Sequence, residues 1–363
     1  MMKGVKSVFY KFGFVGMNIN KMRLGELIKI QTGKLDANAS KKNGKYPFFT
    51  CSKEPLYIDD FNYDCECVLV AGNGDLNVKY YMGKFNAYQR TYIIENKFGN
   101  KLYMPYLYYF LRKYVEVLRN KSIGGVIKYI KLNNLTEIKI CLPNDINQKL
   151  IVRKLKKIET TIECRKKQIQ LLDNLVKSRF VEMFGLPEKN NHGFEVGTIA
   201  DVVKDVHYGT AKKASEDGKY IYIRMNNITY KGDLDLTNTK RINVTEKELA
   251  GCVVQQGDVL FNRTNSKELV GKTCHFSGSE PMIIAGYIIR LRMNGRVLPE
   301  YLSVFMNLAR SKNLLYSMSK GAVGQANINA QEVQSIEIVI PPVELQQQFL
   351  KLFKQVDKSK FVE

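Results

Sequence analysis

The residues that could take part in catalysis do not form a complete site along this chain. The string VGKT at 270–273 resembles the end of a phosphate-binding loop, but Ser266 stands where that loop requires its first glycine. The triplet at 137–139, EIK, could end a nuclease strand, yet no aspartate lies on a clear partner strand. The prolines at 341–342 precede Val343, not the aromatic residue of a base-flipping amino-methyltransferase loop. We therefore expect a non-catalytic protein.

The cysteines and histidines show no spacing that suits a metal site. Cys65 and Cys67 form a C-x-C without a second pair, and the three histidines supply no matching spacing. We therefore expect neither a metal nor any other cofactor. Seven scattered cysteines suit free thiols in a reducing compartment better than disulfides. Because the chain also lacks an apolar run of about 18 residues, we expect a cytoplasmic protein with no membrane partner.

The charge balance indicates a polyanionic partner. Among 363 residues, 56 Lys and Arg face 35 Asp and Glu, which gives a formal net charge of +21. Such an excess favours nucleic acid, although charge alone does not exclude an anionic membrane surface. The apolar and charged fractions, 45% and 25%, are those of an ordinary globular protein. At about 150 residues per domain, the length predicts two or three domains.

Residue types that bind duplex DNA recur in turn segments of both halves of the chain. Lys, Arg and backbone N–H groups bind phosphate, whereas Arg, Asn, Gln and Lys reach base edges. Any one of these residues alone could be a solvated loop residue, and only their clustering favours binding. In the first half the candidates are Gly33, Lys34, Asn73, Lys79, Arg90, Lys121, Gly124, Gly125 and Lys128. In the second half they are Tyr208, Gly209, Thr210, Lys212, Asn262, Arg263, Thr264, Asn265, Lys267, Lys320, Gly321, Gln325 and Asn327.

The two halves repeat one plan. Four stretches of the first half recur in the same order in the second. They are LGEL (24–27) with VGTI (196–199), GKYPFF (44–49) with GKYIYI (218–223), TYIIEN (91–96) with GYIIRL (286–291), and LTEIKICLP (135–143) with VQSIEIVIP (333–341). Two copies of one plan predict two similar domains in a pseudo-twofold arrangement.

Each copy predicts an α+β domain rich in strands. Short apolar runs such as those at 67–71 and 258–262 alternate with turn residues, which is typical of a compact β-rich domain. One helix interrupts this pattern, over 104–119 in the first copy and 298–315 in the second, with proline in its first turn. A glycine-containing loop, a strand ending in proline and a long polar helix follow.

The long polar helix has a coiled-coil seam. No Gly or Pro occurs between Gln148 and Phe184, so we expect one uninterrupted helix. Its apolar residues alternate in spacings of four and three, and Arg165 occupies one seam position. A second helix near the C-terminus repeats only the start of this seam, and we interpret it as truncated. The predicted seam residues are Ile151, Leu155, Ile158, Ile162, Ile169, Leu172, Val176, Phe349, Phe353 and Val356.

From about residue 22 onward the sequence resembles the DNA-specificity subunits of Type I restriction-modification systems. The stretches that carry this resemblance are LPNDINQKLIVRKLKKIE, LLDNLVKSRFVEMFG, VVQQGDVLFNRTN, SKGAVGQANI and IPPVELQQQFLKLFKQVDKSKF. The resemblance implies duplicated target-recognition domains, each followed by a long helix. We accordingly divide the chain into an N-terminal extension (1–21), a first recognition domain (22–143), a spacer helix (144–185), a second recognition domain (186–341) and a C-terminal helix (342–363).

The same resemblance implies how such a protein works. Each recognition domain would read one half of a bipartite target in double-stranded DNA, and the helices would set the spacing between the halves. The helices would also dock modification (methyltransferase) subunits, two of them by the family pattern, and restriction subunits would supply the motor and nuclease. Two alternatives remain at this stage: a truncated or silent specificity cassette acting as a nucleic-acid-binding coiled-coil scaffold, and a fused methylase or nuclease.

Overall fold

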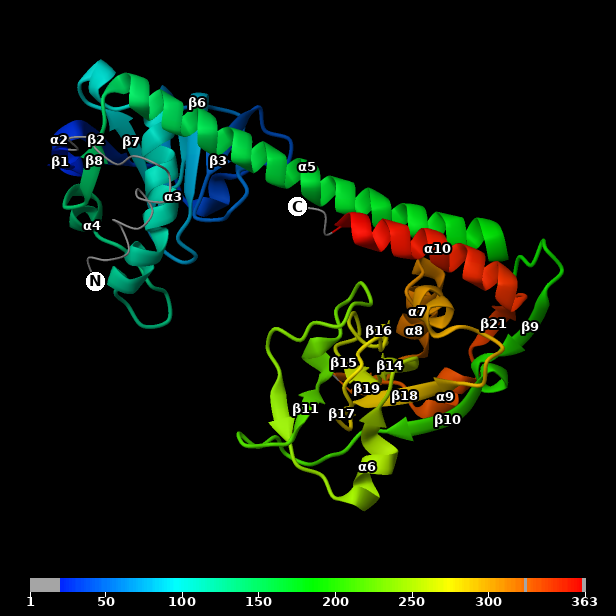
Figure 1. The fold of residues 1–363 in the computed structure, drawn as a ribbon. Helices are drawn as coiled ribbons and strands as arrows, with labels where there is room; N and C mark the ends of the chain where they lie inside the picture. Colours follow the sequence, from blue (N-terminus) through cyan, green and yellow to red (C-terminus); the bar gives the residue numbers. More distant parts are fainter. Residues whose placement is uncertain (1–19, 323–324, 361–363) are drawn as a thin grey trace. The chain divides into compact units, whose positions relative to one another are not determined.

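The protein contains two compact units that divide between Cys164 and Arg165, inside the long helix α5 (Asp145–Phe184). The computed structural model describes residues 20–322 and 325–360 (Figure 1). Both units combine helices with strands, which confirms the α+β prediction. Over the described ranges, no helix is both long enough and apolar enough to cross a lipid bilayer.

The first unit has a central sheet with the strand order β2-β7-β5-β6-β3-β4. Neighbouring strands are antiparallel except for β3 and β6, which are parallel. Helix α3 buries Leu107, Leu111 and Leu118 in a cluster that includes Val68 and Val70 of the sheet. The bounds are β1 Asn20–Arg23, α2 Leu24–Leu27, β2 Ile28–Thr32, η1 Ala37–Ala39, β3 Tyr46–Phe49, β4 Leu56–Ile58, β5 Tyr63–Ala71, β6 Val78–Ala87, β7 Thr91–Asn96, η2 Gly99–Lys101, α3 Met104–Lys121, α4 Leu132–Thr136 and β8 Lys139–Leu142.

The second unit repeats this sheet in the order β10-β18-β14-β16. The long strand β6 corresponds to two shorter strands, β16 and β17, so β11, β12 and β13 gather around β17 in a separate sheet. The bounds are β9 Glu195–Thr198, η3 Ile199–Val202, β10 Val203–Tyr208, β11 Tyr220–Ile223, η4 Met225–Asn227, β12 Lys240–Ile242, α6 Glu246–Cys252, β13 Val253–Val254, β14 Asp258–Asn262, β15 Thr264–Asn265, β16 Thr273–His275, β17 Met282–Ile284, β18 Ile288–Met293, α7 Pro299–Met306, α8 Ala309–Met318, β19 Lys320–Ala322, β20 Gln325–Asn327, α9 Ala330–Gln334, β21 Glu337–Ile340 and α10 Val343–Lys360.

A buried glutamine ties each long helix to the domain before it. In the first unit, Gln148 Oε1 accepts from Tyr103 N (2.8 Å), and its Nε2 donates to Lys101 O (3.0 Å) and Pro143 O (2.8 Å). In the second unit, Gln346 makes the same three bonds, to Leu298 N, Arg296 O and Pro341 O. Both side chains are 0% exposed. These matching bonds show that the repeat predicted from the sequence is a structural repeat.

Two of the sequence matches are out of register. Leu24 and Ile199 donate to equivalent carbonyls, so Leu24 corresponds to Ile199 and the match of 24–27 with 196–199 is wrong by three residues. Thr91 and Ile288 accept from equivalent glycines, Gly33 and Gly209, so the match of 91–96 with 286–291 is wrong by two. A shift of two residues keeps every side chain on the same face of a strand. The alternating pattern of 91–96 therefore still matched that of 286–291 despite the error in register.

The predicted helix over 298–315 is two helices, α7 and α8. The break lies at Asn307, whose Nδ2 donates to Thr273 O and Ser303 O at 2.8 Å each, and at Leu308, whose backbone is extended. An asparagine side chain that bonds backbone carbonyls competes with the helix, and periodicity alone does not reveal this competition. The glycine-containing segment that follows α8 was expected to be a loop, but its residues 320–322 and 325–327 pair as β19 and β20.

Helix α5 is continuous over 40 residues, as its lack of Gly and Pro predicted. In the second unit α10 lies along its C-terminal part, where Phe180 meets Phe349 at a ring-centroid distance of 5.4 Å (Figure 1). Arg165 Nη2 donates to Ser359 O (2.9 Å) near the end of α10, a favourable place for a cation.

The predicted seam residues lie in different environments. Leu172, Val176, Phe349, Phe353 and Val356 belong to or pack on the core of the second unit. In the first unit, Ile151 packs on the core, whereas Ile158 and Ile162 are 43% and 49% exposed. Leu155 and Ile169 are half-buried. Their pairing in one coiled coil stays a prediction.

The glutamine ties should be costly to remove. We expect Gln346→Ala to lower the free energy of unfolding by about 2–3 kcal/mol, because Leu298 N–H and two carbonyls would lose their buried partner. Gln347→Ala, which removes an exposed neighbour, is the control and should change stability little. Urea denaturation followed by circular dichroism measures both variants, and equal stabilities would contradict the structural role of Gln346.

Candidate nucleic-acid interface

A glycine lets the chain leave the first strand of each sheet very close to a neighbouring turn. Gly33 follows β2, and a Cβ there would lie 2.2 Å from Ala87 O. Gly209 follows β10, and a Cβ there would lie 2.2 Å from Ile284 O. Both carbonyls belong to the backbone, so only glycine permits this approach. The two glycines were candidate DNA contacts, and the structure gives both the same local environment.

In the second unit four segments meet around Arg263. Arg263 N donates to Tyr287 O (2.9 Å), and Ile328 N donates to Arg263 O (2.9 Å). Strand β15 pairs with β20 through Thr264 and Asn327. The segments 208–211, 262–266, 285–288 and 325–328 therefore form one surface, the second loop cluster.

The first unit builds the equivalent surface. Gly72 N donates to Arg90 O (2.8 Å), and Ile130 N donates to Gly72 O (2.9 Å). Asn73 forms an isolated bridge with Tyr129. The segments 33–35, 72–75, 88–91 and 122–130 form the first loop cluster. Each unit thus gathers turns that are far apart in sequence, and most of the candidate residues lie in them.

The candidates divide into three groups in the structure. Those within the loop clusters are Gly33, Lys34, Asn73, Arg90, Gly124, Gly125, Lys128, Tyr208, Gly209, Thr210, Asn262, Arg263, Thr264, Asn265 and Asn327. Those at or beyond the margins are Lys79, Lys121, Lys212 and Lys267. Lys320, Gly321 and Gln325 belong to β19 and β20, but their side chains lie outside the described part of the structure.

Two candidates, Asn262 and Thr264, have buried side chains that form hydrogen bonds within the second loop cluster. Asn262 is 0% exposed, and its amide fits best with the nitrogen donating to Tyr287 O (3.2 Å) and Thr264 O (3.0 Å). Thr264 is also buried, and its Oγ1 donates to Asn327 Oδ1 at 3.2 Å. In this conformation both side chains stabilise the loop and leave other residues to face a ligand. Their direct contact with DNA stays a prediction.

Lys267 and Lys212, at the margins of the second loop cluster, differ in what their ammonium groups contact. Lys267 Nζ lies 4.6 Å from the ring centroid of Tyr316, an exposed residue of α8. Lys212 instead forms an ion pair with Glu248 at 2.6 Å. The hydrogen bond from Lys212, together with those from Thr245, lowers the pKa of Glu248 to about 2, so this pair is ionised at neutral pH. Lys267 is therefore better placed than Lys212 to bind a phosphate.

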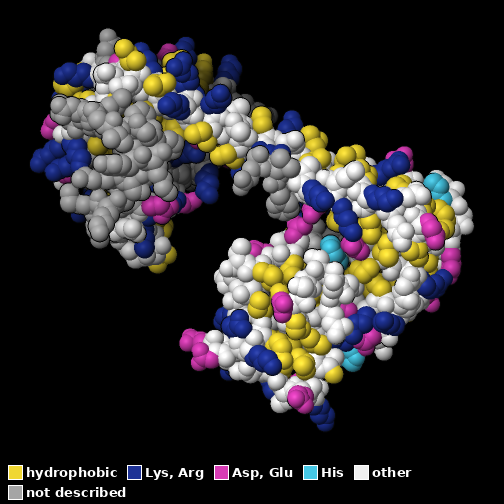
Figure 2. Space-filling view, viewed as in Figure 1, with side chains coloured by type: hydrophobic (Ala, Val, Ile, Leu, Met, Phe, Trp, Pro, Cys, Tyr) yellow, Lys and Arg dark blue, Asp and Glu magenta, His cyan; other side chains and the backbone are white. Residues whose placement is uncertain are grey.

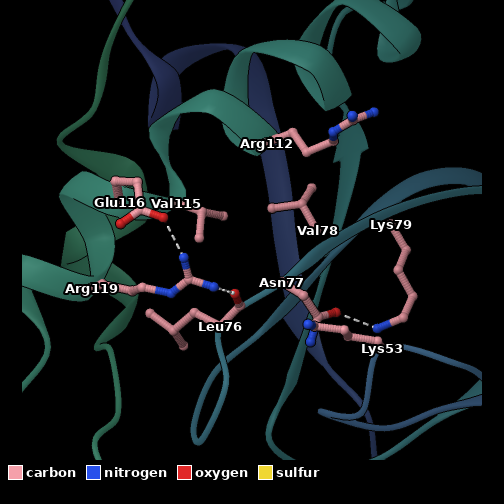
Figure 3. A pocket seen from close by; sticks show the side chains of 9 residues that line it. All are labelled: Lys53, Leu76, Asn77, Val78, Lys79, Arg112, Val115, Glu116 and Arg119. Atoms are coloured by element: carbon pink, nitrogen blue, oxygen red, sulfur yellow. Dashed lines mark hydrogen bonds and ion pairs between the residues drawn. The ribbon is translucent and has the colours of Figure 1, made fainter. Parts of the chain in front are cut away.

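A basic pocket of about 290 Å³ lies beside the first loop cluster (Figure 3). Lys53, Lys79, Arg112 and Arg119 line it together with Asn77 and Glu116, and Lys79 Nζ donates to Ser52 O at 2.6 Å and to Asn77 Oδ1. Burial lowers the pKa of Lys79, which forms no ion pair with a described carboxylate. The other three cations are already in ion pairs, Lys53 and Arg119 with Asp75 and Arg112 with Glu159, so Lys79 is the cation of this pocket best placed for an anionic group.

The sequence analysis found only Lys79 among the basic residues of this pocket. Lys53 follows β3, and Arg112 and Arg119 are on α3, so their convergence depends on how α3 packs on the sheet. Tyr287 and Tyr316, both about half exposed, were missed for the same reason. Tyrosine close in sequence to basic residues was the available signal. On the face shown in Figure 2, Lys and Arg are spread widely, so charge alone does not locate a site.

These features define a duplicated α+β protein with two equivalent loop clusters. A family model for the Type I restriction modification DNA specificity domain matches the chain twice, over residues 17–174 and 191–361. Because these matches cover most of the sequence, the chain belongs to this family. The resemblance inferred from the sequence is thereby confirmed.

Known relatives agree with this assignment. The chain is similar to the Type I restriction enzyme EcoDI specificity subunit of Escherichia coli, with 40% identity over 156 residues, 43% of this chain and 34% of that one. It is also similar to the EcoKI specificity subunit of Escherichia coli, with 24% identity over 265 residues, 66% of this chain and 56% of that one. The chain thus spans about one third to just over half of these relatives.

A solved structure shows the same fold. The S subunit of a Type I restriction-modification system from M. genitalium has a TM-score of 0.59 to this chain at 16% sequence identity. The similarity covers 95% of this chain and 91% of that one. The arrangement of a repeated β-rich domain and long helices is therefore shared with that protein.

The close approach at Gly209 predicts that a side chain at this position destabilises the protein. We expect Gly209→Ala to lower the free energy of unfolding by about 1–3 kcal/mol, since its Cβ would collide with two backbone carbonyls. Gly251→Ala in α6 is the control, because its Cβ would meet nothing within 4 Å. Thermal and urea unfolding measure both. Equal stability of the two variants would show that the turn relaxes without cost.

Proposed function

We propose that this chain is a sequence-specific DNA-binding specificity subunit of a Type I restriction-modification complex. The recognition domains, 22–143 and 186–341, each bind one half of a bipartite target in double-stranded DNA. The observation that carries this proposal is the duplicated loop cluster, built by equivalent hydrogen bonds in both units. Family membership supplies the class of ligand, and the loop clusters supply a surface in each domain for one half-site.

Each loop cluster offers an arginine that is free to bind. Arg90 in the first cluster and Arg263 in the second form no side-chain hydrogen bond or ion pair with a described residue. Backbone N–H groups and neighbouring lysines such as Lys34 and Lys128 add contacts suited to phosphates. One free guanidinium with surrounding lysines in each domain fits a surface that combines base reading with phosphate binding.

The helices 144–185 and 342–363 set the spacing between the half-sites and dock the modification subunits. A helix of 40 residues rises about 60 Å, longer than one turn of B-DNA at about 34 Å. Its N-terminus is tied to the first domain by Gln148, and α10 is tied to the second by Gln346. Rigid attachment at these points supports a role in measuring distance along DNA.

In this proposal the chain recognises DNA and its partners perform the reactions. Methyl transfer belongs to modification subunits, two of them in this proposal, and cleavage belongs to restriction subunits. The chain itself is proposed to be non-catalytic and to bind no cofactor, as expected from the residue patterns at 270–273 and 341–342. A complex reconstituted without this chain should retain the methyltransferase fold but lose selection of the target.

The function can be tested through genomic methylation. In a host that carries the chain and its modification subunit, modified-base sequencing should find one methylated motif with two specified blocks separated by unread bases. Deletion of the gene should remove that motif and no other, and complementation should restore it. If the methylation pattern does not change on deletion, the chain is not an active specificity subunit.

Salt dependence tests the phosphate contacts. We expect Lys267→Ala to weaken DNA binding and to reduce the slope of log affinity against log salt by about 0.9, the value for one phosphate contact. Lys231→Ala removes the same charge, but Lys231 is already paired with Asp173 at 2.8 Å. Binding of labelled duplex over a series of salt concentrations should therefore separate the two variants. Equal slopes would remove Lys267 from the interface.

A further inference from the structure

Arg263 differs from every other arginine of the second unit. The guanidinium of each of the others has a hydrogen-bond or ion-pair partner, either a side chain or a backbone carbonyl oxygen. These partners are Gln168 and Ser359 O for Arg165, Glu182 for Arg179, Asn238 O for Arg224, Gly218 O for Arg241, Asp205 for Arg290, Asp258 for Arg292, Glu195 for Arg296 and Glu188 for Arg310. Arg263 has no hydrogen bond or ion pair from its guanidinium to a described residue. The fold therefore uses the other guanidinium groups internally and leaves this one available.

The position of Arg263 is nevertheless fixed. Its backbone is bonded on both sides, to Tyr287 O and Ile328 N. Its guanidinium carbon lies 4.9 Å from the ring centroid of Tyr208. Tyr208 is itself held in place, because its Oη accepts a hydrogen bond from Ala330 N (2.9 Å) at the start of α9. A guanidinium held over an anchored ring by a cation–π contact is preorganised for binding.

The available donors of Arg263 are those that a base edge requires. Its Nε is enclosed and has no partner, whereas the two terminal nitrogens are not among the enclosed, unpartnered atoms. A phosphate can be bound by a single ammonium group such as that of Lys267, without a fixed orientation. A guanine edge instead requires two parallel N–H groups in a fixed plane, directed at O6 and N7. The Tyr208 ring, 4.9 Å from the guanidinium carbon, restricts where these N–H groups can lie.

We propose that Arg263 reads one guanine in the half-site of the second recognition domain, with two N–H groups on O6 and N7 in the major groove. This inference rests on the proposed function and deepens it. Tyr208 is a positioning residue that orients the guanidinium.

The effect should be confined to one half-site. In the first unit, Gly72 makes the two backbone hydrogen bonds that correspond to those of Arg263. A Cβ at Gly72 would lie 2.4 Å from Arg90 O. No side chain can therefore occupy the equivalent position in the first domain. Its free arginine, Arg90, instead takes the place of Tyr287. Arg90→Ala is consequently a matched variant that should act on the other half-site.

Selection from a random pool of duplex DNA tests the proposal. The full chain, with modification subunits of a Type I system added, should enrich a motif with two specified blocks. Arg263→Ala and Arg263→Lys should both lose the preference for guanine at one position of one block, by roughly tenfold to a hundredfold, and keep the rest. Arg90→Ala should leave that position unchanged. Tyr208→Leu should weaken the same preference partly, as a positioning role requires.

A base analogue tests the contact directly. Replacement of that guanine by 7-deazaguanine, which lacks N7, should weaken binding of the unaltered chain but cause no further loss in Arg263→Ala. An unchanged motif in Arg263→Ala, or a uniform loss over all sequences with a smaller salt slope, would overturn guanine reading while the proposed function stands. Absence of any enriched motif with the unaltered chain would overturn the proposed function and this inference with it. Equal thermal stability of Arg263→Lys and the unaltered chain excludes misfolding as the cause.

Discussion

Two buried side-chain amides determine where each long helix begins relative to the domain that precedes it. Gln148 and Gln346 each satisfy one N–H and two carbonyls that would otherwise be buried without partners. Such a network has one arrangement that satisfies every group, and displacement of the helix would break all three bonds together. The position of each long helix relative to the loop cluster of the same unit therefore depends on these hydrogen bonds.

Above this fixed base the two units combine a shared framework with different side chains. The hydrogen bonds of Gly72 and Arg263 are equivalent, yet one residue has no side chain and the other has the only guanidinium left unpaired in the described part of its unit. Backbone bonds can be conserved while side chains change, because the ladder does not depend on residue type. The fold therefore allows two domains with one architecture to present different chemical groups.

The sequence predicted local features well and non-local features poorly. The helix over 148–184 was found within three residues of its observed start, because Gly and Pro act locally. Placement of Arg90 and Arg263 in turns also followed from local patterns. The cation–π contact of Arg263 with Tyr208 could not be predicted, because it depends on strand register, and a two-residue error in register left the alternation of side chains intact. Asn262 has the residue type of a base contact but is buried, and burial is a tertiary property.

The distribution of the positive charge separates affinity from selectivity. A net charge of +21, with Lys and Arg spread widely over the face shown in Figure 2, would attract any polyanion, and in the proposed function it supplies binding that is independent of DNA sequence. Most arginines of the second unit are neutralised within the fold, for example Arg290 by Asp205 and Arg292 by Asp258. Internal pairing removes competing guanidinium groups that could bind phosphates in many orientations. In the proposed function, discrimination depends on the few guanidinium groups that the fold leaves unpaired, which makes it a property of particular loops instead of the total charge.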